Sequence, residues 1–141
     1  MKTLFSGLLF LLFPLTLHAQ ITLTAIDVGH GDAVLVQHQA YSVLIDGGRP
    51  ETLVSDYLRD QGVSEVQLLI ATHAHADHVG GLVEVLSRKK VHEVWYNGQA
   101  HTTLTFERFI DAILESGAGY SEPARGDSLT VWGHDHQSPA P

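Results

Sequence analysis

The most informative absence from the 141-residue sequence is cysteine. Without cysteine the protein has neither a disulfide framework nor a lipid-modified thiol. Any metal site must therefore be built from histidine and carboxylate side chains. The sequence supplies 10 His and 16 Asp and Glu residues from which such a site can be assembled.

Basic residues are also scarce, because 8 Lys and Arg stand against 16 Asp and Glu and the formal net charge is −8. So acidic a chain lacks the basic footprint that is typical of a nucleic-acid binder. A bound divalent ion would offset the negative charge locally. Anionic substrates are therefore expected only at a metal centre, and DNA is only weakly supported as a substrate.

No apolar run reaches the roughly 20 residues that a membrane span requires. The longest candidate, Leu8–Leu17, follows the basic Lys2, is interrupted by Pro14 and precedes the small residue Ala19. This pattern predicts a signal peptide over residues 1–19. We therefore expect an exported protein, periplasmic or secreted after cleavage. The alternative is a membrane anchor formed by an uncleaved signal.

Residues 20–132 are expected to form one domain, followed by a disordered tail at 133–141. Apolar and β-branched runs indicate strands, whereas apolar residues at helical spacing indicate helices. The expected strands are Ile21–Val28, Ala33–Gln37, Tyr41–Ile45, Val66–Ala71, Val91–Tyr96 and Leu129–Trp132, and the expected helices are one from Pro50 that stops before Gly62, His78–Lys89 and Thr103–Glu115. Strands that alternate with helices predict a layered α/β fold.

A dense cluster of metal-binding residue types follows the most apolar strand and leads into a helix: His73, His75, Asp77 and His78. In an extended segment residues i and i+2 point the same way, so His73 and His75 can face one ion. The turn into the helix re-aims Asp77 and His78, which can serve a second ion. Imidazole and carboxylate together suit Zn, with Mn or Fe as alternatives. The competing interpretation, a solvated turn with satisfied histidines, leaves the position of the cluster unexplained.

Three ordered motifs carry a family resemblance. The segment from His73 to His78, with Gly80-Gly81 after it, resembles the metallo-β-lactamase superfamily. Asp27–Ala33 and Leu44–Gly48 are similar to the ComEC-like subgroup, named for a competence protein, which commonly has Gln where this chain has His30. The resemblance implies an αββα sandwich, of which this chain supplies only the N-terminal αβ half.

The resemblance also implies a dinuclear site and a role for each residue of the cluster. His73 and His75 would bind the first metal ion, and Asp77 and His78 the second. Asp46 would not bind metal but would hold the metal loop, the segment that carries His73 and His75, in place by hydrogen bonding. The implied reaction is hydrolysis, in which a hydroxide shared by the two ions attacks a phosphodiester or an ester. Asp77 would also act in catalysis by accepting a proton from the water.

Relatives supply three further ligands downstream, and this chain ends before the expected place of at least the last two. Among the candidate substitutes, Gly126-Asp127 comes too early, and His134 and His136 lie in the Pro-ending tail. His30 and His101 are candidates for the substrate cleft instead. His30 has the better claim, because the glycines beside it allow close approach of a backbone.

Two further interpretations remain open. The first is a truncated or inactive metal-binding or accessory module without catalysis, which the absent ligands favour. In either case the half sandwich would expose an apolar sheet face, so the missing C-terminal half or a dimer partner is expected to cover it. The second, a β-lactamase proper, has no support beyond the fold, and fold alone does not set function.

Overall fold

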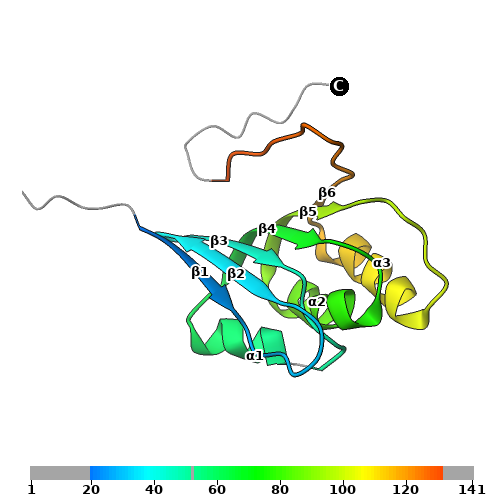
Figure 1. Cartoon of the computed structure of the whole chain (residues 1–141), viewed down its shortest axis with the longest axis horizontal. Helices are drawn as coiled ribbons and strands as arrows, with labels where there is room; N and C mark the ends of the chain where they lie inside the picture. The colour runs from blue at the N-terminus through cyan, green and yellow to red at the C-terminus, as the bar shows by residue number, and fades with distance from the viewer. Residues whose placement is uncertain (1–19, 52, 132–141) are drawn as a thin grey trace, which may run out of the picture.

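The computed structural model describes residues 20–51 and 53–131, which form one six-stranded sheet and three helices (Figure 1). The strands are β1 (Ile21–Ala25), β2 (Val34–His38), β3 (Tyr41–Ile45), β4 (Glu65–Ala71), β5 (Lys90–Tyr96) and β6 (Gly119–Ser121), and the helices are α1 (Leu53–Asp60), α2 (Ala76–Arg88) and α3 (Leu104–Ser116). This layered arrangement confirms the predicted α/β fold class.

The strands lie in sequence order across the sheet, from β1 to β6. The first three are antiparallel, and β2 and β3 are joined by a tight turn in which Gln39 has a positive φ of 54°. From β3 onward the strands are parallel. Parallel neighbours need a crossover connection, which α1, α2 and α3 supply in turn.

The three helices cover one face of the sheet (Figure 1). Their apolar residues meet the strands in a single buried cluster. The helices contribute Val54, Leu58, Val79, Leu82, Val85, Leu86, Phe109, Ala112 and Ile113, and the strands contribute residues that include Leu35, Leu44, Leu69, Val94 and Tyr96. This core fixes the first turn of α2 against the ends of the strands.

The opposite face of the sheet is also apolar. Residues that are direct cross-strand partners share a face, and the register places Leu23, Val36, Val43 and Leu68 in one such row. Val43 and Leu68 are buried but stand outside the helix-side cluster, whereas Leu23 is 69% exposed. Within the described ranges, no helix packs on this face (Figure 1).

One strand prediction is wrong, and one strand was not predicted. Residues 129–131 of the predicted strand Leu129–Trp132 form no strand, and Trp132 lies outside the described residues. The sixth strand is instead Gly119–Ser121, which pairs with β5. Three residues that begin with glycine carry too weak a local pattern to predict a strand, and only pairing with β5 defines it.

The helix boundaries also differ in detail. The helix expected at His78 begins at Ala76, which places Asp77 in its first turn. On α3, Leu114 is 76% exposed, and Gly117 ends this helix in a left-handed conformation. No helix in the described part of the chain has the length and apolarity needed to cross a membrane. The expected signal peptide and tail, 1–19 and 133–141, lie outside the described residues.

Candidate metal centre

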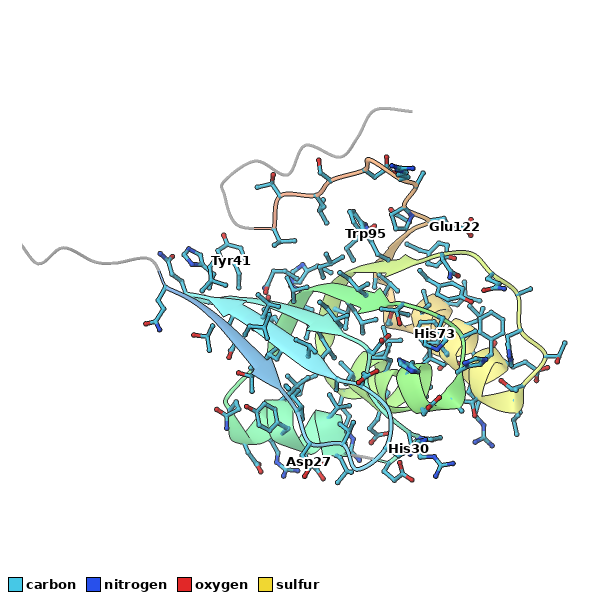
Figure 2. The ribbon with its side chains drawn as sticks, in the orientation of Figure 1. Asp27, His30, Tyr41, His73, Trp95 and Glu122 are labelled. Carbon is cyan, nitrogen blue, oxygen red and sulfur yellow. The ribbon has the colours of Figure 1, made fainter. Side chains whose placement is uncertain are left out.

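The candidate site lies at the carboxyl edge of the sheet, where β3 and β4 end and α2 begins. Because β3 and β4 are parallel, their carboxyl ends meet at this edge. Asp46 follows β3 directly, and His73 follows β4 by two residues. Figure 2 shows His73 at this edge and His30 on the loop that leads to β2. Residues from three separate motifs are thus brought together.

Asp46 is the buried centre of a hydrogen-bond network. Its Oδ1 accepts from the backbone amide of Thr72 at 2.8 Å, and its Oδ2 accepts from the Thr72 hydroxyl at 2.6 Å. The Nδ1 of His78 lies 2.9 Å from the same Oδ2. The Asp46 side chain is only 5% exposed and that of His78 only 14%. The carboxylate therefore holds the start of the metal loop and the His78 ring in fixed positions.

The same network sets which nitrogen of each imidazole carries the proton. A carboxylate oxygen accepts hydrogen bonds, so His78 donates from Nδ1 to Asp46, and Nε2 is the ring nitrogen that is left for another partner. The single hydroxyl hydrogen of Thr72 goes to Asp46, and Thr72 Oγ1 therefore accepts from His73 Nδ1 at 3.0 Å. Both rings thus present Nε2 for ligation. A carboxylate that orients a ligating histidine in this way is common at metal sites.

The three imidazoles of the motif are close neighbours. The ring centres of His73 and His75 are 4.8 Å apart, and those of His73 and His78 are 3.9 Å apart. Two imidazoles bound to one tetrahedral zinc, with Zn–N of about 2.0–2.1 Å, have ring centres about 5 Å apart. His75 is the residue at the N-cap of α2, yet its side chain makes no capping hydrogen bond. Its ring therefore stays available to an ion shared with His73.

Asp77 lies beside a glycine-rich loop, residues 27–33. His30 Nε2 is 3.5 Å from Asp77 Oδ2, and His78 Nε2 is 4.0 Å from Asp32 Oδ2. The loop packs so closely that a Cβ added at Gly31 would lie 1.7 Å from the carbonyl oxygen of Asp77. The structure therefore brings His30, a predicted cleft residue, to the predicted ligand pair.

The electrostatic surroundings of Asp77 favour its ionised form. A hydrogen bond from its own backbone amide lowers the pKa of Asp77, and the imidazoles of His78, His30 and His75 lower it further, against an opposing effect of partial burial. The positive end of α2 acts in the same direction, since Asp77 sits in the first turn. Asp77 is thus a carboxylate, able to bind a cation or accept a proton.

His101 lies on the other side of the motif, on the loop between β5 and α3. Its ring centre is 5.5 Å from that of His75. The loop is tied down, because Tyr96 donates its hydroxyl hydrogen to the carbonyl of Gln99 and the Asn97 amide donates to the carbonyl of Thr72 at 3.3 Å. His101 therefore stands beside His75 on a loop that is held by hydrogen bonds, and its role in a substrate cleft stays a prediction.

The donors fit a metal centre in pairs and do not complete one. Among residues 20–51 and 53–131, no group of three or more His, Asp or Glu side chains is placed to hold an ion. His73 and His75 form one pair of donors, and Asp77 and His78 form the other. Asp127 stands apart, since its Oδ2 accepts from the Ala124 amide within a local turn. His134 and His136 lie outside the described residues.

Three site residues escaped the sequence analysis. Thr72 links Asp46 to His73, Asp32 faces His78, and Asn97 ties the β5–α3 loop to the metal loop. Thr72 and Asp32 stand next to motif residues, and adjacency to His73 and Gly31 was the available signal. Asn97 offered no signal, because only the parallel pairing of β4 with β5 brings it to this edge.

The comparison with curated proteins finds a relative in Bacillus subtilis (strain 168). ComE operon protein 3 is 29% identical over 126 residues, which cover 75% of this chain and 16% of that protein. This match confirms the resemblance to the ComEC-like subgroup. The chain spans only a small part of its relative.

Solved structures of metallo-β-lactamases are also similar to this chain. Rm3 metallo-beta-lactamase is 31% identical with a TM-score of 0.47, over 54% of this chain and 29% of that chain. MEM-A1, a subclass B3 metallo-beta-lactamase isolated from a soil metagenome library, is 30% identical with a TM-score of 0.47, over 53% and 30% respectively.

The family model gives the broadest match. The model described as the metallo-beta-lactamase superfamily matches residues 26–139, which include all the ligand candidates of the motif and the loop of His101. Together with the strand-end Asp46 and the histidine cluster at the start of α2, this match shows that the chain belongs to the metallo-beta-lactamase superfamily.

Proposed function

We propose that this chain supplies the metal-holding part of a hydrolase that cleaves a phosphodiester or an ester. The superfamily consists generally of metal-dependent hydrolases. The observation that carries the proposal is the Asp46 network, which presents Nε2 of His73 and of His78 to the same open edge. A solvated turn gives no reason to bury a carboxylate in order to orient two imidazoles.

The residues divide the work as follows. His73 and His75 hold one divalent ion, and Asp77 and His78 hold a second. Zn is the first choice for this donor set, with Mn and Fe as alternatives. When bound, such ions supply Lewis acidity and a water of lowered pKa. Asp77, as a carboxylate beside that position, accepts the proton.

The walls of the site determine how a substrate is held. His30, from the loop of residues 27–33, lies beside Asp77, and His101, from the β5–α3 loop, lies beside His75. Each offers an imidazole to a substrate oxygen. The preference for a phosphodiester follows from the resemblance to the ComEC-like subgroup. DNA is the less favoured substrate, because the chain carries a net charge of −8, which disfavours binding of a long polyanion.

Metal binding and hydrolysis test this proposal together. Zn²⁺ and Mn²⁺ are titrated by calorimetry into the chain, and cleavage of bis(p-nitrophenyl) phosphate and p-nitrophenyl acetate is followed. H73A/H75A is expected to lose binding of one ion and most cleavage. H92A is the matched control, because His92 pairs with Glu65 at the other end of β4 and β5. Cleavage by H73A/H75A at the level of H92A would refute the proposal.

A second candidate function is a metal-binding or accessory module without catalysis. The absence of any three-donor group in the described residues favours it, because a catalytic zinc normally has about three protein ligands. The same titration distinguishes the two. Weak binding without cleavage supports the accessory module, whereas tight binding of two ions per chain refutes it.

We also propose that residues 1–19 direct export to the periplasm or the medium and are then removed. The support is the short apolar run with its basic start. Mass spectrometry of the exported protein is expected to show an N-terminus at Gln20. A membrane-bound product that begins at Met1 would favour an uncleaved anchor instead.

A further inference from the structure

Backbone contacts hold the glycine-rich loop, residues 27–33, on two sides. On one side, the Gly48 amide donates to the carbonyl of Asp32 at 2.9 Å, just after β3. On the other, Gly31 rests against the backbone of Asp77 with no room for a side chain. Backbone packing, independent of any side-chain interaction, therefore sets Asp32 beside the first turn of α2.

In this position Asp32 faces the His78 ring. Because Nδ1 of His78 is bonded to Asp46, Nε2 is the ring nitrogen that is left for a further partner. Asp32 Oδ2 lies 4.0 Å from that Nε2. A cation bound at Nε2 therefore lies within reach of the Asp32 carboxylate. Among the described residues, no Lys or Arg forms an ion pair with Asp32.

The distances suit two donors of one cation. Donors bound to a tetrahedral ion at about 2.0–2.2 Å are about 3.4 Å apart. The separation of 4.0 Å is slightly longer, and the Asp32 side chain is 77% exposed, so solvent and not packed protein surrounds most of it. Its carboxylate can therefore approach an ion at His78 without moving the backbone, which the contacts of Gly31 and Gly48 hold in place.

We propose that Asp32 is a further carboxylate donor of the metal centre, which helps to hold the cation bound at His78. This inference rests on the metal site of the proposed function. Asp77 and His78 supply two donors to this ion. Asp32 would be the third donor from within the chain. The ligand is a divalent cation that accepts mixed imidazole and carboxylate ligands.

Cobalt binding tests the assignment without relying on activity. Co²⁺ is titrated into the full chain and into D32N, D32E and D111N, with calorimetry and the visible ligand-field spectrum as readouts. We expect D32N to weaken Co²⁺ binding by about tenfold or more and to alter the spectrum. D32E, which keeps a carboxylate, is expected to recover part of the affinity. D111N removes the same charge from the exposed surface of α3 and is expected to bind as the unaltered chain does.

The outcomes separate this inference from the proposed function. If D32N, D32E and the unaltered chain bind Co²⁺ with the same affinity and spectrum, Asp32 is not a donor and the metal site stands without it. If D111N weakens binding as much as D32N, the effect is one of net charge and the inference is also wrong. If the unaltered chain binds no Co²⁺, the metal site itself is refuted. Circular dichroism of each variant establishes that it is folded.

Discussion

Asp46 combines a strained backbone with a buried carboxylate. Its φ is 57°, in the left-handed region that Asp tolerates better than most residues. This conformation turns the chain away from β3 and aims the carboxylate at Thr72 and His78. Strain of this kind persists where the surrounding structure enforces it, and it gathers at functional sites. At the scale of single residues, the site is organised around this one carboxylate.

At the same scale, Thr72 is a positioning residue whose effect is testable. Thr72→Val keeps the shape of the side chain but removes the hydroxyl that joins Asp46 to His73. We expect Zn²⁺ affinity to fall by about tenfold, as for other groups that orient metal ligands. Calorimetric titration measures the change.

Thr72→Ser is the matched control, because it restores the hydroxyl and should bind Zn²⁺ nearly as tightly as the unaltered chain. Equal affinities of the valine and serine variants would show that the hydroxyl does not position His73.

At the scale of elements, the site depends on how a loop and a helix start are packed. α2 begins at Ala76, and the Gly47 amide donates to the carbonyl of His78 at 2.7 Å, so the turn after β3 is bonded to the first turn of the helix. The glycine-rich loop then packs against Asp77 from outside. These backbone contacts determine which side chains surround an ion.

Glycine substitutions in this loop can separate two costs of adding a side chain: the cost of a left-handed backbone conformation and the cost of a steric clash. Gly29 and Gly31 both have positive φ, of 74° and 90°, but a Cβ at Gly29 would meet no atom within 4 Å. Gly29→Ala should therefore cost only about 1–2 kcal/mol of unfolding free energy, for the left-handed conformation. Gly31→Ala should cost at least about 1 kcal/mol more, for the displaced backbone of Asp77.

Urea unfolding of the two variants measures this difference. Equal unfolding free energies would mean that the loop is not held against α2 as the structure shows.

A pH-dependent contribution to the stability of the fold comes from the starts of β4 and β5, at the edge of the sheet that lies away from the metal centre. A hydrogen bond from His92 and the nearby Lys90 ammonium lower the pKa of Glu65 below its ordinary value of 4.5. The folded state therefore gains stability from the ionised carboxylate above that ordinary value, and loses it as pH falls through the lowered pKa. Glu65→Gln should thus lower the free energy of unfolding at pH 7 and have almost no effect on it at pH about 3.

Urea midpoints of the unaltered chain and the variant, taken across this range, check the sign. Glu107→Gln, on the exposed surface of α3, serves as the control and should show no such convergence. A gap that widens in acid would contradict the assignment.

At the scale of the whole molecule, the helices of the described residues cover one face of the sheet only. The helix side is closed by the core, whereas the opposite face carries the apolar row of Leu23, Val36, Val43 and Leu68. Val43 and Leu68 are buried, but Leu23 and Ile21 on β1 are 69% and 57% exposed. Exposed apolar surface of this kind marks a place of interaction. The chain is therefore expected to associate through this face when it is studied alone.

Leu23→Lys tests that expectation, because Leu23 is 69% exposed and its replacement removes no core contact of the helix side. We expect sedimentation velocity to show concentration-dependent association of the unaltered chain and less of it in the variant.

Leu114→Lys is the matched control: Leu114 is 76% exposed but lies on α3, on the helix side of the sheet. Equal association in all three proteins would show that the apolar sheet face does not take part.

Sequence reasoning predicted much of this molecule because its signals are local. Spacing and composition located the three helices, five of the six strands and the motif from His73 to His78. The hydrogen-bonding role expected for Asp46 from the resemblance agrees with its bonds to Thr72 and His78. The ligand roles themselves stay predictions. The weak strand β6 was beyond such reasoning, since only its pairing with β5 defines it.

The sequence by itself determined the chemistry that is available: without cysteine, and with three histidines and an aspartate at the start of a helix, a divalent ion has only imidazole and carboxylate to bind. Only the tertiary structure decided which groups stand together and which nitrogen each ring offers. Asp32 and Thr72 lie about forty residues apart in the chain, yet both border His78 or its supporting carboxylate. The reason is physical: parallel strands bring their carboxyl ends to one edge, and backbone packing there sets contacts that no local pattern encodes.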